Sequence, residues 1–143
     1  MMGAVRVPVR LKNAVDEELV VRGLLAPHLL RQNEVIGLVD TGAVSLVIPS
    51  EMVEQLGLRI IGQRIAQYVN GNQETIGVTR PIIIECEGRI TVDEALVMGN
   101  EVLIGQVILE KLDLLVDCKN QQLIPNPANP DYPVAMIKGY KNA

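Results

Sequence analysis

Asp40, Thr41 and Gly42 form the one short motif in this sequence whose residue types and order could do chemistry. They follow directly on the apolar run at residues 35–39. An Asp at the end of a buried strand, followed by a small hydroxyl residue and a glycine, makes a tight turn in which backbone amides can approach the carboxylate. The same tripeptide is also a common turn without chemistry, and that alternative stays open at this point.

The composition leaves few other catalytic chemistries. His28 is the only histidine, whereas Ser/His and Cys/His catalysis and most metal sites use imidazole as base or ligand. Cys86 and Cys118 are far apart and form no CxxC pair, so we expect buried free thiols rather than a zinc site or a disulfide framework. The phosphate-binding patterns GxGxxG and GxxxxGK[ST] do not occur. What remains is mainly carboxylate chemistry, or none, and we expect no metal and no cofactor.

The length and charge of the chain exclude several kinds of architecture and binding partner. The chain has 143 residues, room for one domain, and its net charge is −4. No stretch concentrates Lys and Arg, which argues against a nucleic-acid partner. The uncharged runs at residues 41–50 and 120–130 are the longest, and each has about half of the ~20 residues of a membrane-spanning helix, so we expect no membrane partner. Because the N-terminus lacks the unbroken apolar run of a signal peptide, we expect a cytoplasmic location.

Short apolar segments between turn residues predict an all-β fold with one or two short helices. The apolar residues are mainly Val, Leu and Ile, with no Phe or Trp, which is typical of a strand-rich core. Asn70-Gly71 is the strongest hairpin signal, and Gly57 is well placed to end a helix that starts near Pro49. A second short helix is expected over 107–112. The expected strands cover residues 5–11, 19–25 as its hairpin partner, 34–39, 45–48, 59–69, 73–86, 89–97, 102–104 and a last hairpin over 114–123.

A weak internal similarity relates two parts of the chain. Residues 45–58 align with residues 101–114, and both stretches read as a strand followed by a helix. This pattern predicts a pseudo-twofold repeat. Independent convergence of two amphipathic strand-helix units is the alternative.

The order of these features resembles the retropepsin-like aspartic proteases, the single-lobed family that includes the retroviral enzymes. LVDTGAVSLVIP (38–49) is similar to the family's catalytic turn and the strand after it, and YVNGNQ (68–73) is similar to its flap. VLIGQVILEKLDLLVDCKNQQLI (102–124) is similar to its hydrophobic-hydrophobic-Gly signature, helix and final hairpin. The resemblance extends over residues 35–125. It implies a closed β-barrel, the half-fold of acid proteases.

This resemblance also divides the chain. Residues 34–125 are expected to form the protease core, and residues 1–33 an extra N-terminal hairpin. Together, residues 1–125 would make one domain. Residues 126–143 then form a Pro-rich C-terminal tail.

The resemblance implies an aspartic endopeptidase that works as a homodimer, because each chain carries a single Asp-Thr-Gly turn. Two Asp40 carboxylates, one from each subunit, would share a proton and activate a water that attacks the peptide bond. Thr41 would hydrogen-bond across the dimer beneath this dyad, and the backbone of Gly42 would contact a protein or peptide substrate bound in extended form. The remaining implied substrate-binding residues are Leu38, Ala43, Ser45, Val47, Tyr68, Val69, Asn70, Gly71 and Leu103.

Two departures from the retroviral pattern concern the same network. Val44 and Gln106 stand where retroviral enzymes have an Asp and an Arg that form ion pairs near the dimer contact. Dimerisation therefore cannot copy that network. Two alternatives remain: a non-catalytic module that uses the same cleft to bind peptides or the same interface to dimerise, and a small β-rich partner protein in which Asp40 only supports a turn.

Overall fold

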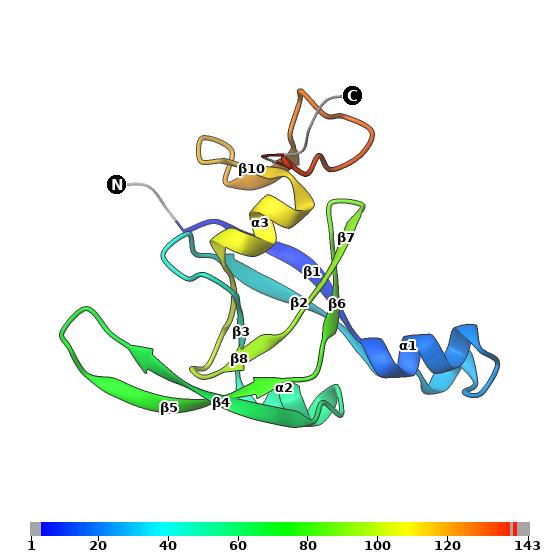
Figure 1. Cartoon of the computed structure of the whole chain (residues 1–143). Coiled ribbons are helices and arrows are strands. Elements are labelled where there is room, and N and C mark those ends of the chain that lie inside the picture. The colour runs from blue at the N-terminus through cyan, green and yellow to red at the C-terminus, as the bar shows by residue number, and fades with distance from the viewer. Residues whose placement is uncertain (1–3, 138, 140–143) are drawn as a thin grey trace.

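The computed structural model describes residues 4–137 and residue 139. Nine strands form one sheet in the order β4-β5-β8-β3-β9-β2-β1-β6-β7, and β10 pairs with β11 in a separate ribbon beside α3 (Figure 1). The strands are β1 Arg6–Asn13, β2 Gln32–Val39, β3 Leu46–Ile48, β4 Ile60–Gln67, β5 Gln73–Thr79, β6 Ile82–Cys86, β7 Arg89–Asp93, β8 Ala95–Val97, β9 Val102–Ile104, β10 Leu114–Asp117 and β11 Gln122–Pro125. The helices are α1 Ala14–Val21, α2 Ser50–Gln55, α3 Gln106–Leu112 and the 3-10 helix η1 Pro27–Leu29. None of the helices in this part of the chain has the length and apolar character needed to cross a membrane.

The sheet buries one face of β1, which pairs antiparallel with both β2 and β6. Its residues alternate between exposed and buried positions, as they must when successive side chains point to opposite faces. Fully burying one large aliphatic side chain stabilises the fold by about 1.5–3 kcal/mol. The core gathers such side chains from most elements: Val5, Val7, Val9, Leu11, Leu46, Ile48, Leu56, Ile82, Ile84, Ile104, Ile108, Leu109, Leu112 and Leu123.

The loop from Asp40 to Ser45 crosses the chain at Gly105. The amide of Gln106 donates to the carbonyl of Ala43 (2.8 Å), and the amide of Val107 donates to the carbonyl of Val44 (3.0 Å). A Cβ atom at position 105 would lie 2.3 Å from the Ser45 carbonyl oxygen and 2.7 Å from that of Ala43. Glycine is therefore required here by close backbone approach.

Most of the expected elements are confirmed. The β4–β5 hairpin has its tip at Asn70-Gly71, and Gly71 takes the positive φ of 87° that this turn needs. Helix α2 ends at Gln55, two residues before Gly57, whose φ of 60° suits the residue after a C-terminal cap. The final hairpin is β10–β11. The two similar stretches at 45–58 and 101–114 both fold as strand then helix, and β3 lies antiparallel to β9; a pseudo-twofold relation between them stays a prediction.

The expected N-terminal hairpin is wrong, because the end of α1 and the turn after it occupy residues 19–25, where its second strand was expected. The side chain of Asn13 accepts a hydrogen bond from the Asp16 amide (2.9 Å), which caps the helix at its first turn. Helix α1 and η1 extend from the sheet as an insertion between β1 and β2 (Figure 1). The fold is thus mostly β with three α-helices, one more than expected.

The expected closed barrel is also wrong. The sheet has two end strands, β4 and β7, which do not pair with each other. The β4–β5 hairpin extends away from the body, whereas β7 lies against α3 (Figure 1). The two ends therefore have different neighbours and the sheet stays open. A smaller correction concerns the thiols: Cys86 is buried as expected, but Cys118 is exposed.

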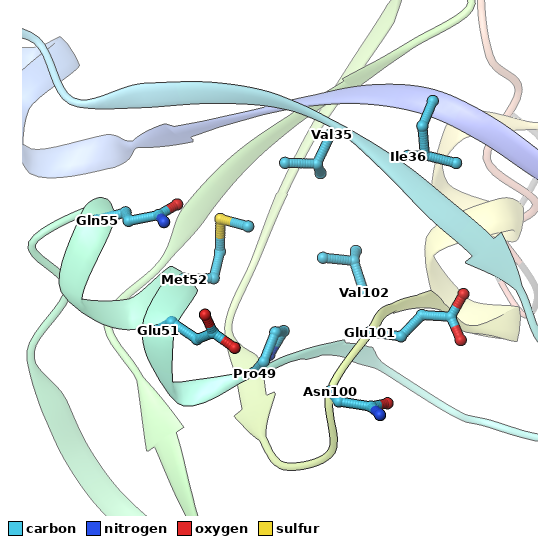
Figure 2. Close-up of a pocket in the computed structure, with 9 residues that line it drawn as sticks. All are labelled: Val35, Ile36, Pro49, Glu51, Met52, Gln55, Asn100, Glu101 and Val102. Atoms are coloured by element: carbon cyan, nitrogen blue, oxygen red, sulfur yellow. The ribbon is translucent and has the colours of Figure 1, made fainter.

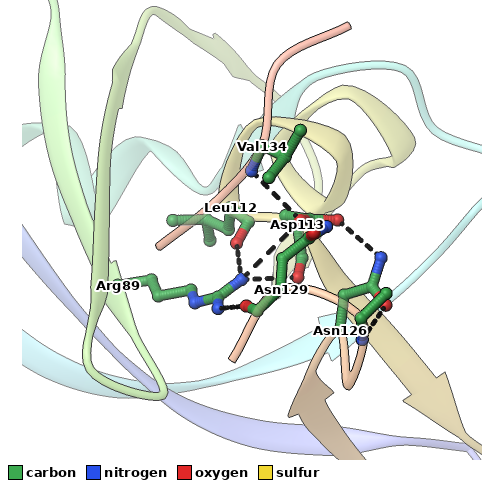
Figure 3. A network of polar contacts seen from close by, with 7 residues as sticks. Arg89, Leu112, Asp113, Asn126, Asn129 and Val134 are labelled. Atoms are coloured by element: carbon green, nitrogen blue, oxygen red, sulfur yellow. Dashed lines mark hydrogen bonds and ion pairs between the residues drawn. The ribbon is translucent and has the colours of Figure 1, made fainter. Parts of the chain in front are cut away.

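The first part of the Pro-rich tail is tied to the end of α3 by a polar network (Figure 3). The buried Arg89 guanidinium donates to the carbonyls of Leu112, Asp113 and Asn129. The Asp113 carboxylate accepts hydrogen bonds from the side chains of Asn126 (3.1 Å) and Asn129 (2.6 Å) and from the Val134 amide (3.1 Å). One buried cation and one carboxylate thus attach residues 126–134 to the domain.

We predict that the Asp113 contacts make stability depend on acid pH. Side-chain hydrogen bonds from Asn126 and Asn129, then the Val134 amide and the charge of Arg89, hold the pKa of Asp113 below its usual 3.8. A carboxylate whose pKa is lower in the folded state stabilises the fold above its unfolded pKa, and this contribution is lost as pH falls through the folded pKa. The melting temperature of Asp113→Asn should therefore lie below that of the wild type near pH 6, and the two should converge as the pH falls below 3.8 and the Asp113 carboxylate takes up its proton.

Asp131→Asn, a change of the same charge at an exposed position of the same tail, is the matched control and should follow the wild type at every pH. A difference between Asp113→Asn and wild type that stays constant from neutral to acid pH would contradict this assignment.

We further predict that Gly105→Ala destabilises the protein by about 1–3 kcal/mol, because the added methyl forces the 43–45 loop away from the chain it crosses. Urea unfolding measures the effect. Gly62→Ala is the control: no heavy atom lies within 4 Å of the position its Cβ would take, so its midpoint should be unchanged or higher. Equal midpoints for both variants would refute the requirement for a glycine at position 105.

Candidate active site

The Asp40 turn lies at the end of β2 and is fixed by main-chain contacts. The Asp40 amide donates to the Ile104 carbonyl (3.0 Å), and the Ala43 amide donates back to the Asp40 carbonyl (3.1 Å). The Gly42 amide donates to Oδ1 of the Asp40 carboxylate (2.9 Å), which sets the direction of that side chain. Asp40 is half-buried, whereas Thr41 and Gly42 are exposed. The turn thus presents an oriented carboxylate at the surface of a single chain.

An apolar row crosses the sheet next to this turn. Leu38 of β2 pairs with Leu103 of β9, Leu103 with Val47 of β3, and Val47 with Leu96 of β8. Directly paired residues point to the same face of a sheet, so these four side chains share the face opposite to Leu46, whose side chain is fully buried. Leu38, Leu96 and Leu103 remain partly accessible to solvent. The four side chains form a continuous apolar surface across the sheet.

Leu96 is the member of this row that the sequence did not suggest as a site residue. Three others, Leu38, Val47 and Leu103, were expected from the resemblance. The signal for Leu96 is its register: β8 runs parallel to β3 and places Leu96 beside Val47. Because the two paired segments are almost 50 residues apart, Leu96 can be recognised only once the strand topology is known.

The expected flap is the tip of the β4–β5 hairpin. The Tyr68 amide donates to the Asn72 carbonyl and the Gly71 amide to the Tyr68 carbonyl, both at 2.9 Å, and Val69 is fully exposed. Partial desolvation and the Glu74 carboxylate, which accepts from the Tyr68 hydroxyl, raise the pKa of Tyr68. In Figure 1 this tip and the loop after β2 project toward the same side of the molecule. Of the other expected residues, Ala43 and Ser45 are half-buried in the loop at Gly105.

Val44 and Gln106, the two departures from the retroviral pattern, lie on either side of the contact between the Asp40 loop and the start of α3. Val44 is exposed, and Gln106 directs its amide along α3 to the Glu110 carboxylate (3.2 Å). The loop and the helix are joined instead by their backbones, through the two amides that follow Gly105. These bonds stabilise the Asp40 loop whatever the side chains at positions 44 and 106.

Other chemistry-bearing residues have structural roles. Burial raises the pKa of the Cys86 thiol to about 12, which keeps it protonated and unreactive. The Asp117 carboxylate caps the β10–β11 turn by accepting from the backbone and side chain of Asn120. Within residues 4–137, no three His, Cys, Asp or Glu side chains come together as a metal site would require.

A separate hollow of about 460 Å³ lies between β2, β9 and α2, away from the Asp40 turn (Figure 2). Its floor is apolar, with Val35, Met52 and Val102, and its rim carries the carboxylates of Glu51 and Glu101. Glu101 is paired with Arg6 (3.1 Å). None of the lining residues is among those expected to bind substrate, and the hollow adds nothing to the Asp40 site.

Comparison with solved structures finds many chains similar to this one. The retroviral protease-like domain of Ddi1 from Leishmania major is 16% identical, with a TM-score of 0.57, and the match covers 89% of this chain and 91% of that domain. EIAV protease, solved in complex with the inhibitor HBY-793, is 26% identical, with a TM-score of 0.49, over 55% of this chain and 77% of the viral one. The Leishmania domain shares the fold over nearly the whole chain. Comparison with curated protein sequences gives no match.

A family model provides the assignment that these structural likenesses alone do not. Residues 28–106, more than half of the chain, match the model described as aspartyl protease. The matched segment begins at η1, contains the Asp40 turn, the flap hairpin and the apolar row, and ends just past Gly105. The chain therefore belongs to the retropepsin-like aspartyl protease family.

Proposed function

We propose that this protein is an aspartic endopeptidase, active as a homodimer, with Asp40 of each subunit in the catalytic pair. The observation that carries the proposal is the oriented Asp40 carboxylate, fixed by the Gly42 amide at the end of β2 and next to the apolar row. Family membership supports the reaction class. Its activity and its oligomeric state can be tested separately.

The proposed reaction needs two carboxylates in different protonation states. When two such groups lie within a few ångströms, they hold one proton between them and titrate as a pair. The ionised Asp40 takes a proton from a bound water while the protonated Asp40 of the other subunit polarises the scissile carbonyl. The water attacks the carbonyl carbon, and no covalent enzyme intermediate forms.

The surface of the Asp40 turn suits this arrangement. Thr41 and Gly42 are exposed in the single chain, so a second copy can approach them across a twofold axis. In the proposed dimer the Thr41 hydroxyl hydrogen-bonds across the axis, and the Gly42 backbone pairs with the substrate. The main chain of the loop is already fixed by Gly105, so subunit contact need not order it.

The substrate is proposed to be a peptide bound in extended form with apolar side chains next to the cleaved bond. Leu38, Val47, Leu96 and Leu103 supply an apolar surface on the sheet, and the flap at Tyr68 to Gln73 closes over the peptide from the other side. Main-chain hydrogen bonds would give affinity, and the apolar contacts would give selectivity.

Asp40→Asn is expected to lower the rate of peptide cleavage by about a thousandfold or more, because an amide can neither take the proton from water nor share one with its partner. The assay is cleavage of a peptide library, read by mass spectrometry over a broad pH range, with a pepstatin-type inhibitor as a second probe. Asp117→Asn removes a carboxylate that only caps a turn, and should leave cleavage unchanged.

Two results would count against the enzyme. Wild-type protein that binds peptides but cleaves none at any pH, with binding that survives Asp40→Asn, would favour a non-catalytic peptide-binding module of the same fold. Cleavage that persists in Asp40→Asn would move the chemistry to another residue.

Dilution tests the dimer. If two chains build one site, specific activity should fall once the protein concentration drops below the dimer dissociation constant, and sedimentation equilibrium should report dissociation in the same range. A chain that sediments as a monomer at high concentration and still cleaves peptides would exclude a shared pair of Asp40 residues.

A further inference from the structure

Helix α1 buries a charged side chain and exposes apolar ones, which is the reverse of a surface helix in a folded domain. Asp16 is the only buried residue of α1. Val15 and Val21 are 51% and 70% exposed, and in the turn that follows Leu24 is 72% exposed. Of these, Val15 and Leu24 lie together in the wall of one hollow. Apolar side chains gathered on a surface mark an interaction site more often than scattered single ones do.

Polar contacts, not apolar packing, fix this insertion to the sheet. The Asp16 carboxylate accepts from the Arg31 side chain (2.8 and 2.9 Å) and from the Arg31 amide (3.0 Å). The buried Asn13 donates to the Leu56 carbonyl (2.9 Å) while it caps α1. Helix α1 is therefore anchored by polar contacts, while its apolar side chains at Val15 and Val21 stay exposed.

Two adjoining hollows lie along this free side. The first, of about 410 Å³, is mainly apolar, with Val15, Leu19, Leu24 and Pro81 in its wall. Glu18 also lines it, and its carboxylate is paired with Arg22. The second, of about 390 Å³, has three arginines in its wall, Arg31, Arg59 and Arg80. Val15 and Arg80 line both hollows, so together they form one surface that is apolar at one end and cationic at the other.

Arg59 and Arg80 bring positive charge to this surface that no ion pair neutralises within residues 4–137. Both residues are exposed. Arg31 uses Nε and Nη2 for Asp16, and its Nη1 lies over the open backbone of Gly57. On a chain with a net charge of −4, these arginines form a local positive site.

We infer that this surface, formed by α1, Leu24, Arg59 and Arg80, docks an acidic amphipathic segment of a partner protein. Leucine-type side chains of the segment pack on Val15 and Leu24, and its carboxylates pair with Arg59 and Arg80 in the charge-assisted geometry that arginine favours. A long polyanion fits less well, because the chain as a whole is negative and half of the surface is apolar. The surface shares no residue with the Asp40 site and does not depend on the proposed activity.

Fluorescence anisotropy with a labelled helical peptide of about 14 residues tests the inference. The peptide carries leucines on one face with glutamates beside them; a second peptide has lysine in place of every glutamate. The full-length protein should bind the acidic peptide and not the basic one. Arg80→Glu should weaken binding at least about tenfold, and Leu24→Ser, a change at an exposed position, should weaken it independently.

Lys119→Glu is the matched control, because it makes the same change in net charge at the exposed β10–β11 turn, and it should alter affinity less than twofold. Equal binding of the two peptides, or equal effects of Arg80→Glu and Lys119→Glu, would overturn the inference. Binding of a single-stranded oligonucleotide that requires Arg80, without binding of the acidic peptide, would overturn it in favour of a polyanion site.

Discussion

The close passage of the 43–45 loop over Gly105 is the contact on which the Asp40 site depends. Backbone atoms meet there with no side chain between them, and two amides just beyond Gly105 donate into the loop. Buried main-chain hydrogen bonds are lost only at a cost of about 1–3 kcal/mol each when a partner is left unsatisfied. The direction of the Asp40 carboxylate is thus set by the main chain of two connections, each of which follows a strand of the same sheet.

This backbone contact fixes the Asp40 loop without any ion pair from the side chains at positions 44 and 106. An ion pair near a protein surface contributes about 0–1 kcal/mol, because solvent screens it and two long side chains must be ordered. The loop here is joined to α3 by amides whose position does not depend on side-chain identity. Val44 can therefore be exposed and Gln106 can turn to Glu110 while the Asp40 turn keeps its geometry.

Local sequence signals were enough to predict the region of the Asp40 site. The features that depend on pairing between distant strands could not be predicted in this way. Asn70-Gly71, Gly57 and Asp40-Thr41-Gly42 each act through their own turn, so their structural consequences follow from a few adjacent residues. The segment after β1 was ambiguous: its apolar residues fit a returning strand until Asn13 is recognised as a helix cap. Leu96 and the open sheet depend on which strands lie side by side, and no local pattern specifies that.

The base of the α1 insertion contacts the turn after α2 through two side chains, Arg31 and Asn13. Gly57 follows the end of α2, and because it has no Cβ, the Arg31 guanidinium can lie where that atom would be. Arg31 in turn anchors Asp16 of α1. Because α2 follows β3 after a single residue, the base of the insertion is fixed relative to the apolar row of the sheet. A segment bound at α1 would therefore be held at a defined place on the domain, since the anchoring contacts are short and at least partly buried and join the start of α1 to Arg31 and to the turn after α2.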